Sequence, residues 1–406
     1  MTATRGTLYS GGASDGEALG GLTHDGCGVE KAIALLAKGR ARLEAIHHAD
    51  CALRHDFCSK NSRCIWGAMT TLLAAGEVVI AEGHWQRLVG RHLDGCEPLL
   101  LLVRAQITRL VGDLHGARDE FEKVISAPAP LRIHQIALPW LIETLAVLGE
   151  LEQAAELVKE TDIDRIAGRK SPNQALLLGA RGVLNLRLGR DEDAMVDLLA
   201  AGRGPVVEHS ASPVLSRWRS LAGLGARESR PELATKLVTA ERGYALRWGA
   251  PIRIGWALSA YAIVAGHERT IELLEDAAEV LEIAGGRVEL PFVCRELGKR
   301  CAEAGDTAGA RNMFERALGM AKRLGNTALA DEITQHLVQV APHKPEELTR
   351  REKKIAKLAR AGHSNKEIAS KLALTVRTVE FHLSSVYRKL LISGRRELMS
   401  PTVNLD

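Results

Sequence analysis

The chain has 406 residues, enough for two or three domains. Hydrophobic residues make up 46% of it and charged residues 26%, a balance that excludes wholesale disorder. Aromatic residues are only 4%, whereas a β-sandwich or barrel would need many β-branched and aromatic side chains. The composition therefore predicts an all-α protein.

The sequence also indicates where in the cell the protein is located. The longest leucine stretch, Leu99–Val103, ends at Arg104, far short of the ~18 apolar residues of a membrane span. Met1–Leu8 has neither the basic cluster nor the apolar segment of a secretory signal. The seven cysteines are odd in number and irregularly spaced, which is typical of reduced thiols. We expect a cytoplasmic protein with no membrane partner.

Residues 1–28 contain eight glycines and little apolar periodicity, so we expect them to form a disordered leader. From residue 29 to residue 340 a glycine recurs, followed five residues later by an alanine. The full pairs are Gly76/Ala81, Gly112/Ala117, Gly149/Ala154, Gly189/Ala194 and Gly305/Ala310, while Ser229/Ala234 and Gly266/Ile271 keep one member each. Successive markers are 36, 37, 40, 40, 37 and 39 residues apart, which indicates a structural repeat.

Each repeat reads as two helices joined by a turn. The glycine ends the first helix because it adopts the left-handed conformation at low cost. The alanine lets the second helix approach closely, as in the stripe Ala117, Phe121 and Val124. The pattern resembles tetratricopeptide repeats of a longer kind, which implies a right-handed superhelix over 29–340 that binds a signal or a partner.

The charge distribution separates the C-terminal end from the rest. Residues 341–347 contain Pro342 and Pro345 and form the expected linker. Residues 348–398 carry 13 Lys or Arg and 4 Asp or Glu, a net charge of +9, although the whole chain has only +4. A basic module on a mildly acidic body indicates a polyanionic partner.

Within this basic module, the sequence predicts three short helices. Thr349 with Glu352 and Ser364 with Glu367 each have the spacing of a capping box that opens a helix. Gly362 ends the first helix, and Thr375 is the expected N-cap of the third.

On the third helix, an apolar stripe faces inward and a mixed face points outward. The stripe is Val379, Leu383, Val386 and Leu390, and the opposite face is Arg377, Glu380, Phe381, Ser384 and Arg388. A helix of this size matches the major groove of DNA.

The polar residues of the module occur in a specific order. The matching strings are Leu348-Thr349-x-Arg351-Glu352, Gly362-x-Ser364-Asn365-Lys366-Glu367-Ile368-Ala369 and Thr378-Val379-Glu380-x-His382-Leu383-x-x-Val386-Tyr387-Arg388-Lys389-Leu390. The module, 348–400, resembles the LuxR-type (GerE-like) helix-turn-helix, which implies a four-helix DNA-binding domain whose third helix enters the major groove.

The resemblance assigns DNA contacts position by position. Base contacts would come from Glu380, Phe381 and Ser384. Most relatives carry Lys at the first position, whereas Glu can accept a hydrogen bond from cytosine N4. The expected phosphate contacts are short polar caps and cations, namely Asn365, Lys366, Arg377, Thr378, Arg388 and Lys389. His382 and Tyr387 fit packing and DNA contact equally well.

Two departures from the family pattern bear on dimerisation. Leu391 replaces the glycine that usually follows Lys-Leu, and the fourth helix, from about Gly394, is cut short by Pro401. In relatives this helix pairs two copies on DNA, so a homodimer on DNA is expected but its interface is open.

The order of parts resembles the C-terminal half of the large ATP-binding LuxR-type regulators. No G-x-x-x-x-G-K-[ST] loop occurs, so we expect the ATPase domain to be lacking. We find no catalytic constellation and predict neither enzyme activity nor a cofactor.

Together, these expectations predict a transcriptional regulator that controls one pathway and acts as an activator. It binds double-stranded promoter DNA, works with RNA polymerase, and senses a protein, peptide or small molecule through its repeats. The alternative is a repeat scaffold or peptide receptor whose DNA module is degenerate. A metal or redox sensor is a further hypothesis, since Cys51, His55 and Cys58 would share one helix face within the cluster His47–Cys64; packing is the competing explanation.

Overall fold

The computed structural model describes residues 28–91, 93–161, 174–203, 217–340, 348–390 and 394–399, without the side chains of residues 267, 388 and 396. These residues form α-helices and two short 3-10 helices, and the described ranges contain no strand, which confirms the all-α prediction. The expected leader lies outside the described residues except for Gly28, which begins α1.

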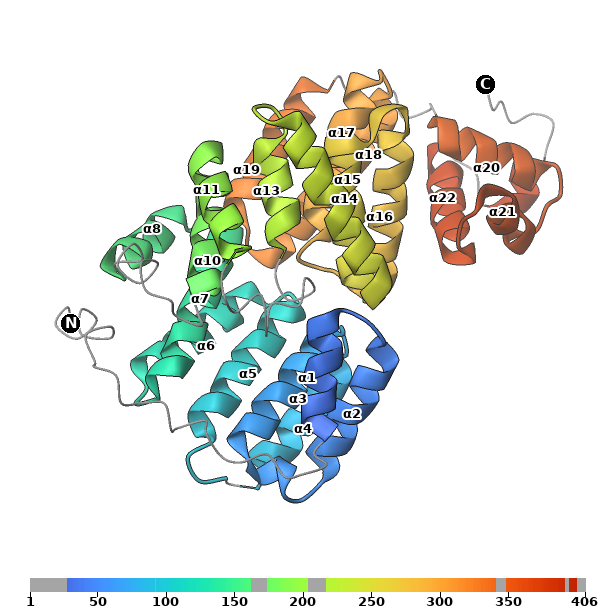
Figure 1. Cartoon of the computed structure of the whole chain (residues 1–406). Coiled ribbons are helices and arrows are strands. Elements are labelled where there is room, and N and C mark those ends of the chain that lie inside the picture. Colours follow the sequence, from blue (N-terminus) through green and yellow to red (C-terminus); the bar gives the residue numbers. More distant parts are fainter. Residues whose placement is uncertain are drawn as a thin grey trace. The chain divides into compact units, whose positions relative to one another are not determined.

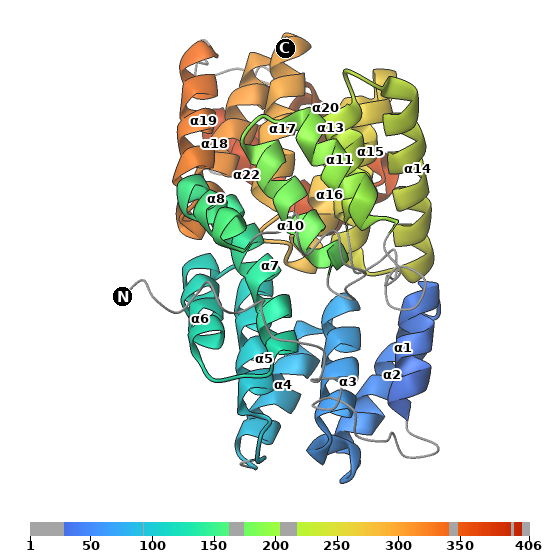
Figure 2. The same cartoon turned by 60° about the vertical axis from the view of Figure 1, so that its left-hand side comes forward.

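The helices follow one another as packed pairs (Figure 1). The first group is α1 (Gly28–Lys38), α2 (Arg42–Arg54), α3 (Ser62–Ala74), α4 (Val78–Val89), α5 (Glu97–Leu110), α6 (Leu114–Ser126), α7 (Leu131–Leu148) and α8 (Leu151–Glu160). The second is α10 (Gln174–Arg187), α11 (Asp191–Ala201), α13 (Trp218–Ala226), α14 (Pro231–Trp248), α15 (Pro251–Ala265), α16 (Thr270–Ala284), α17 (Leu290–Glu303), α18 (Thr307–Leu324) and α19 (Thr327–Gln339). Figure 2 shows α10 beside both α7 and α11.

The repeat glycines end helices as expected. Gly76, Gly112, Gly149, Gly189 and Gly305 all have positive φ, between +69° and +89°. At Gly112, its own N–H bonds to the Arg109 carbonyl and the next N–H bonds to the Thr108 carbonyl, the pattern of a Schellman motif. Gly266 departs from the expectation, because its φ is −72° and a 3-10 helix (His267–Arg269) follows it.

The repeat alanines lie in the packed interior. Ala81, Ala117, Ala154, Ala194, Ala234 and Ala310 are all fully buried. Glycine plays the same part within α15, where a Cβ at Gly255 would lie 2.6 Å from the Leu281 side chain of α16. Small residues therefore set the spacing of paired helices, as the sequence predicted.

One described helix, α7, is long and apolar enough to cross a membrane by length and composition. However, 72% of that window is buried inside the protein, and Phe121 and Trp140 pack there with ring centroids 6.1 Å apart. These features are those of a core helix.

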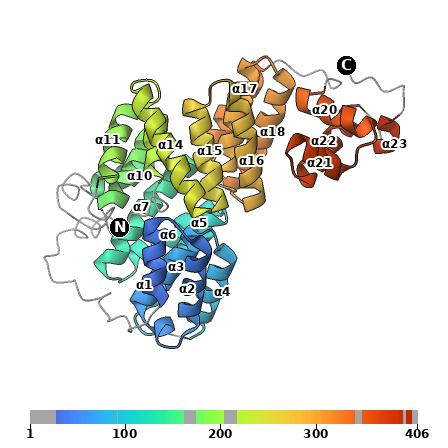
Figure 3. The same cartoon turned by 45° about the vertical axis from the view of Figure 1, so that its right-hand side comes forward.

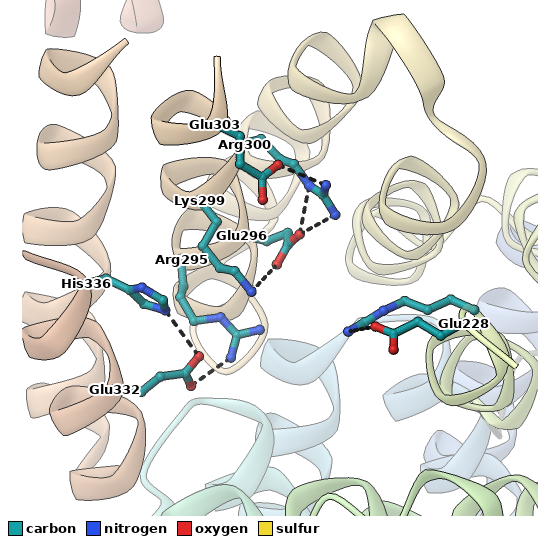
Figure 4. Close-up of polar contacts among 9 residues, drawn as sticks. Glu228, Arg295, Glu296, Lys299, Arg300, Glu303, Glu332 and His336 are labelled. Carbon is teal, nitrogen blue, oxygen red and sulfur yellow. Dashed lines mark hydrogen bonds and ion pairs between the residues drawn. The ribbon is translucent and has the colours of Figure 1, made fainter. Parts of the chain in front are cut away.

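The chain divides into two compact units. One comprises Met1–Val293 and Gly319–Ala330, and the other Cys294–Leu318 and Asp331–Asp406. In the second unit, Arg295 donates to Glu332 at 3.0 Å and Arg300 pairs with Glu296 at 2.9 Å (Figure 4). The linker expected at 341–347 lies outside the described residues.

The cysteine cluster does not form the helix face that the metal hypothesis requires. Helix α2 ends at Arg54, so His55 is its C-cap and Cys58 begins a separate 3-10 helix, Cys58–Lys60. Cys58 is packed into the hydrophobic core, whereas Cys51 is exposed, with its Sγ 3.7 Å from His47 Nε2. The expectation of a shared face is wrong because the helix stops one residue before His55.

Candidate nucleic-acid interface

The C-terminal module consists of α20 (Arg350–Arg360), α21 (Asn365–Leu372), α22 (Val376–Lys389) and the short α23 (Arg395–Leu398), gathered in one small cluster (Figure 3). Its core contains one apolar side chain or more from each helix. The fully buried members include Ile355 and Ala359 from α20, Ile368 from α21, Val379 and Val386 from α22, and Leu398 from α23. This packing fixes the orientation of α22.

The capping box that opens α20 also anchors α22. Thr349 Oγ1 accepts from the Glu352 N–H at 3.2 Å, and Glu352 accepts from the Thr349 N–H at 2.8 Å. The buried Glu352 carboxylate also accepts from Ser385 Oγ at 2.6 Å and from Lys389 Nζ. Burial opposes ionisation, yet the hydrogen bonds from Lys389, Ser385 and Thr349 hold the pKa of Glu352 below its usual value. We call Glu352, Ser385 and Lys389 the α20–α22 clip.

The second capping box and a tight turn place α22 after α21. Ser364 Oγ accepts from the Glu367 N–H at 3.3 Å, and Glu367 accepts from the Ser364 N–H at 2.7 Å. Ala373 then adopts the left-handed conformation, with φ of 53°. Thr375 Oγ1 accepts from the Thr378 N–H at 3.1 Å, which confirms Thr375 as the cap of α22.

The residues expected to read bases lie together on one exposed edge of α22. Glu380, Phe381 and Ser384 are exposed, on the side away from buried Val379 and Leu383. Ser384 Oγ donates to the Glu380 carbonyl at 2.9 Å. The Phe381 side chain is 48% exposed, and its ring centroid lies 5.7 Å from the guanidinium carbon of Arg316 in α18. At ~1.5 Å per residue, the 14 residues of α22 span ~21 Å.

The residues expected to touch phosphates fall into different environments. Lys366 and Arg377 are exposed, at the N-terminal turns of α21 and α22. Thr378 Oγ1 shares a 2.8 Å hydrogen bond with Thr375 Oγ1, and Asn365 Oδ1 accepts from Arg395 at 2.7 Å.

The last two expected phosphate contacts lie near the end of α22. Lys389 is 9% exposed and paired with Glu352, so a phosphate contact would require the α20–α22 clip to open. The side chain of Arg388 and the whole of Leu391 lie outside the described residues.

His382 packs rather than presenting a charge. Burial, together with the positive charge of Arg351, lowers the pKa of His382 to about 4, so its ring is neutral at neutral pH. Tyr387 is half-buried against the module core. The packing alternative is the better description of both side chains in this structure.

Two positioning contacts escaped the sequence analysis. One is the α20–α22 clip. Its only sign in the sequence is Glu352, whose position is already explained by the capping box of α20. The other is Arg395, which donates to Asn365 and to the backbone carbonyls of Ala359 and His363. Arg395 thereby ties α23 to the loop between α20 and α21. A basic residue at a helix start gave no indication of this role.

This arrangement, a capped helix, a tight turn and a second helix with one polar edge exposed, is that of a helix-turn-helix DNA-binding module. Residues 346–401 match the family described as bacterial regulatory proteins, luxR family. The all-helical chain therefore carries a LuxR-type helix-turn-helix domain at its C-terminal end. No curated protein sequence matches the chain.

Proposed function

We propose that this protein is a cytoplasmic, sequence-specific transcriptional regulator that activates the genes of one pathway. The observation that carries the proposal is the exposed edge Glu380, Phe381 and Ser384, held by a folded core on a module of net charge +9. Such an edge suits the major groove, because α22 is long enough to cross it and its inward face is fully occupied by packing.

The proposed base contacts follow from side-chain chemistry. The Glu380 carboxylate accepts from cytosine N4, Phe381 offers an apolar contact to a thymine methyl group, and the Ser384 hydroxyl serves either a donor or an acceptor. Lys366 and Arg377 lie at helix N-termini, where backbone N–H groups also favour phosphate. Asn365, Thr378, Arg388 and Lys389 complete the proposed phosphate contacts.

In the proposed mechanism, the tetratricopeptide-like repeats carry the regulation. A signal bound to them changes self-association, and two tethered modules gain avidity on paired half-sites, as expected for a homodimer on DNA. RNA polymerase is the proposed downstream partner. This mechanism consists of binding steps and needs no enzymatic activity.

The test is selection of bound duplexes from a random-sequence library with the full chain, followed by fluorescence anisotropy on the selected duplex. With 6–10 phosphate contacts, affinity falls by ~10³–10⁵ between 50 mM and 200 mM salt. Glu380→Ala should relax the preference for one base pair, by ~1–3 kcal/mol of discrimination. As the matched control, Arg269→Ala removes an exposed cation from the repeats and should leave both readouts unchanged.

The alternative, a scaffold or peptide receptor with a degenerate module, predicts different results. No sequence would be enriched by the selection, and Glu380→Ala and Ser384→Ala would leave duplex binding as it was. Either finding from correctly folded protein contradicts the proposed function.

A further inference from the structure

The first unit contains a cluster of buried charges that packing does not explain. Four guanidinium groups converge on its interior, and we call them the arginine cluster. They are Arg109 (α5), Arg217 (N-cap of α13), Arg219 (α13) and Arg253 (α15). Buried cations are rare in proteins unless each one has a partner. The partners of these four are therefore informative.

Three carboxylates lie among the arginines and match three of them. Arg109 donates to Glu143 of α7 at 2.8 Å, and Arg217 donates to Glu289 in the turn before α17 at 3.0 Å. Arg219 lies 3.7 Å from the Glu241 carboxylate of α14, which is an ion pair but too long for a hydrogen bond. With four arginines and three glutamates, the cluster keeps a surplus positive charge.

The surplus charge belongs to Arg253. Within the described ranges of the chain, this side chain makes no hydrogen bond and no ion pair, although it is mostly buried. Burial and the neighbouring charge of Arg217 lower the pKa of Arg253 to about 10, so it remains charged at neutral pH. A mostly buried cation without a direct pair destabilises the protein, and the negative charges of Glu241 and Glu289 offset this cost only in part.

Hydrogen-bond donors beside the arginines also lack partners. Trp256 Nε1 and Arg219 Nη1 are buried without a hydrogen-bond acceptor among the residues that the structure describes. The Arg217 guanidinium carbon lies 4.9 Å from the centre of the Trp256 ring, so the indole is in contact with one cation of the cluster. One acceptor, Glu241 Oε2, is also unsatisfied, but it is buried beside Arg219. Orphan polar groups of this kind call for a ligand, an ion or water.

We propose that the arginine cluster binds a small organic oxyanion, a carboxylate or phosphate on a flat apolar body, as the signal of the repeats. The anion would neutralise Arg253 and accept from Trp256 Nε1–H, while the indole offers its apolar face. The side chains of Arg217 and Arg219 are 20% and 16% exposed, so the cluster is in contact with solvent, and so small an exposed area suits a small molecule better than a helix or a duplex. This inference rests on the proposed function, because it gives the chemical class of the signal.

The experiment is thermal unfolding of the full chain at constant ionic strength with benzoate, phenyl phosphate, inorganic phosphate or neutral benzamide. Benzoate or phenyl phosphate well above its dissociation constant should raise the unfolding midpoint by about 2–4 °C, and benzamide should not. Comparison of benzoate with the two phosphates separates a carboxylate ligand from a phosphate ligand.

Arg253→Met tests the site itself. The variant should unfold at a higher midpoint than the wild-type chain without any probe, because it removes an unmatched buried charge, and it should lose the anion-induced rise. As the control, Arg269→Met removes an arginine that is 73% exposed and should keep the rise. The proposal is overturned if no anion raises the wild-type midpoint, or if Arg253→Met retains the full rise.

A second readout separates this proposal from the proposed function. The affinity of Arg253→Met for the selected duplex should stay within about twofold of wild type without probe, since the change lies outside the module. If neither protein selects a duplex while the anion effect is present in wild type alone, the regulator proposal fails and the anion site stands.

Discussion

The α20–α22 clip of the C-terminal module and the arginine cluster of the first unit differ in how their buried charges are paired. In the module, Glu352 is 2% exposed and accepts hydrogen bonds from a backbone N–H, a hydroxyl and an ammonium group. In the first unit, Arg253 is mostly buried and has no pair among the described residues, and one Glu241 oxygen has no hydrogen bond there. The first arrangement stabilises a fold, whereas the second costs stability in the free protein. The difference indicates that the Glu352 site serves the stability of the fold, whereas the arginine cluster suits the binding of a ligand.

The largest expected effect comes from removing the Glu352 carboxylate, the buried charge whose hydrogen bonds are satisfied. Glu352→Ala should destabilise the module by about 3–5 kcal/mol, because it leaves the buried Lys389 ammonium unpaired. A module of about 50 residues has little more stability than that, so duplex affinity should fall by more than ~100-fold. Urea unfolding and anisotropy measure the two effects.

Two controls sharpen this prediction. Glu367→Ala alters the other capping box, which is exposed, and should cause a much smaller loss. Adding Lys389→Met to Glu352→Ala should recover part of the stability, since the unpaired ammonium is then gone. Equal losses from Glu352→Ala and Glu367→Ala would contradict the role given to the α20–α22 clip.

The next largest effect concerns Glu241, the carboxylate with an unsatisfied oxygen in the arginine cluster. Burial raises the pKa of Glu241 to about 7 against the pull of Arg219, Arg253 and Arg217. Because the folded protein holds this proton more tightly than the unfolded chain, stability should fall as pH rises from about 4.5 through 7. Glu241→Gln should remove that dependence and be more stable than wild type at pH 8, by up to about 3 kcal/mol.

Urea unfolding at pH 5.5 and pH 8 measures the Glu241 effect. The groups that face Glu241 are arginines, which do not titrate in this range, so the difference in slope between wild type and Glu241→Gln reports the Glu241 carboxyl. A Glu241→Gln protein whose slope equals that of wild type would mean that Glu241 is ionised throughout.

A smaller effect concerns the exposed cations of the module. Lys366→Ala and Arg377→Ala should each weaken duplex binding about fivefold at 150 mM salt, since each lost phosphate contact lowers the salt slope by about 0.9. The loss should be the same on selected and unselected duplexes. A loss confined to the selected duplex would instead assign the side chain to base recognition.

The sequence predicted local structure better than the contacts between distant residues. The helix class, the repeat glycines and alanines, both capping boxes and the exposed edge of α22 followed from short-range patterns, whose physics is contained in neighbouring residues. Arg253 and Trp256 carried no signal, because their significance depends on Arg109 and Glu289, far away in the chain. The failed helix face of Cys51, His55 and Cys58 is of the same kind, since helix α2 ends at Arg54, four residues short of Cys58.

The smallest expected effect compares the turns of the two regions. Most left-handed positions between paired helices of the described residues hold glycine, with Ala41 as an exception, whereas the turn between α21 and α22 places Ala373 there, with φ of 53°. The left-handed conformation costs a residue with a Cβ ~1–2 kcal/mol, which a glycine avoids. Glycine also raises the conformational entropy of the unfolded chain, and this offsets part of the stabilisation. Ala373→Gly should therefore stabilise the module by about 0.5–1 kcal/mol in urea unfolding. Gly362→Ala, at φ of +88° in the same module, should destabilise it by about 1 kcal/mol. If Ala373→Gly instead destabilised the module, side-chain contacts of Ala373 would outweigh the cost of its backbone conformation.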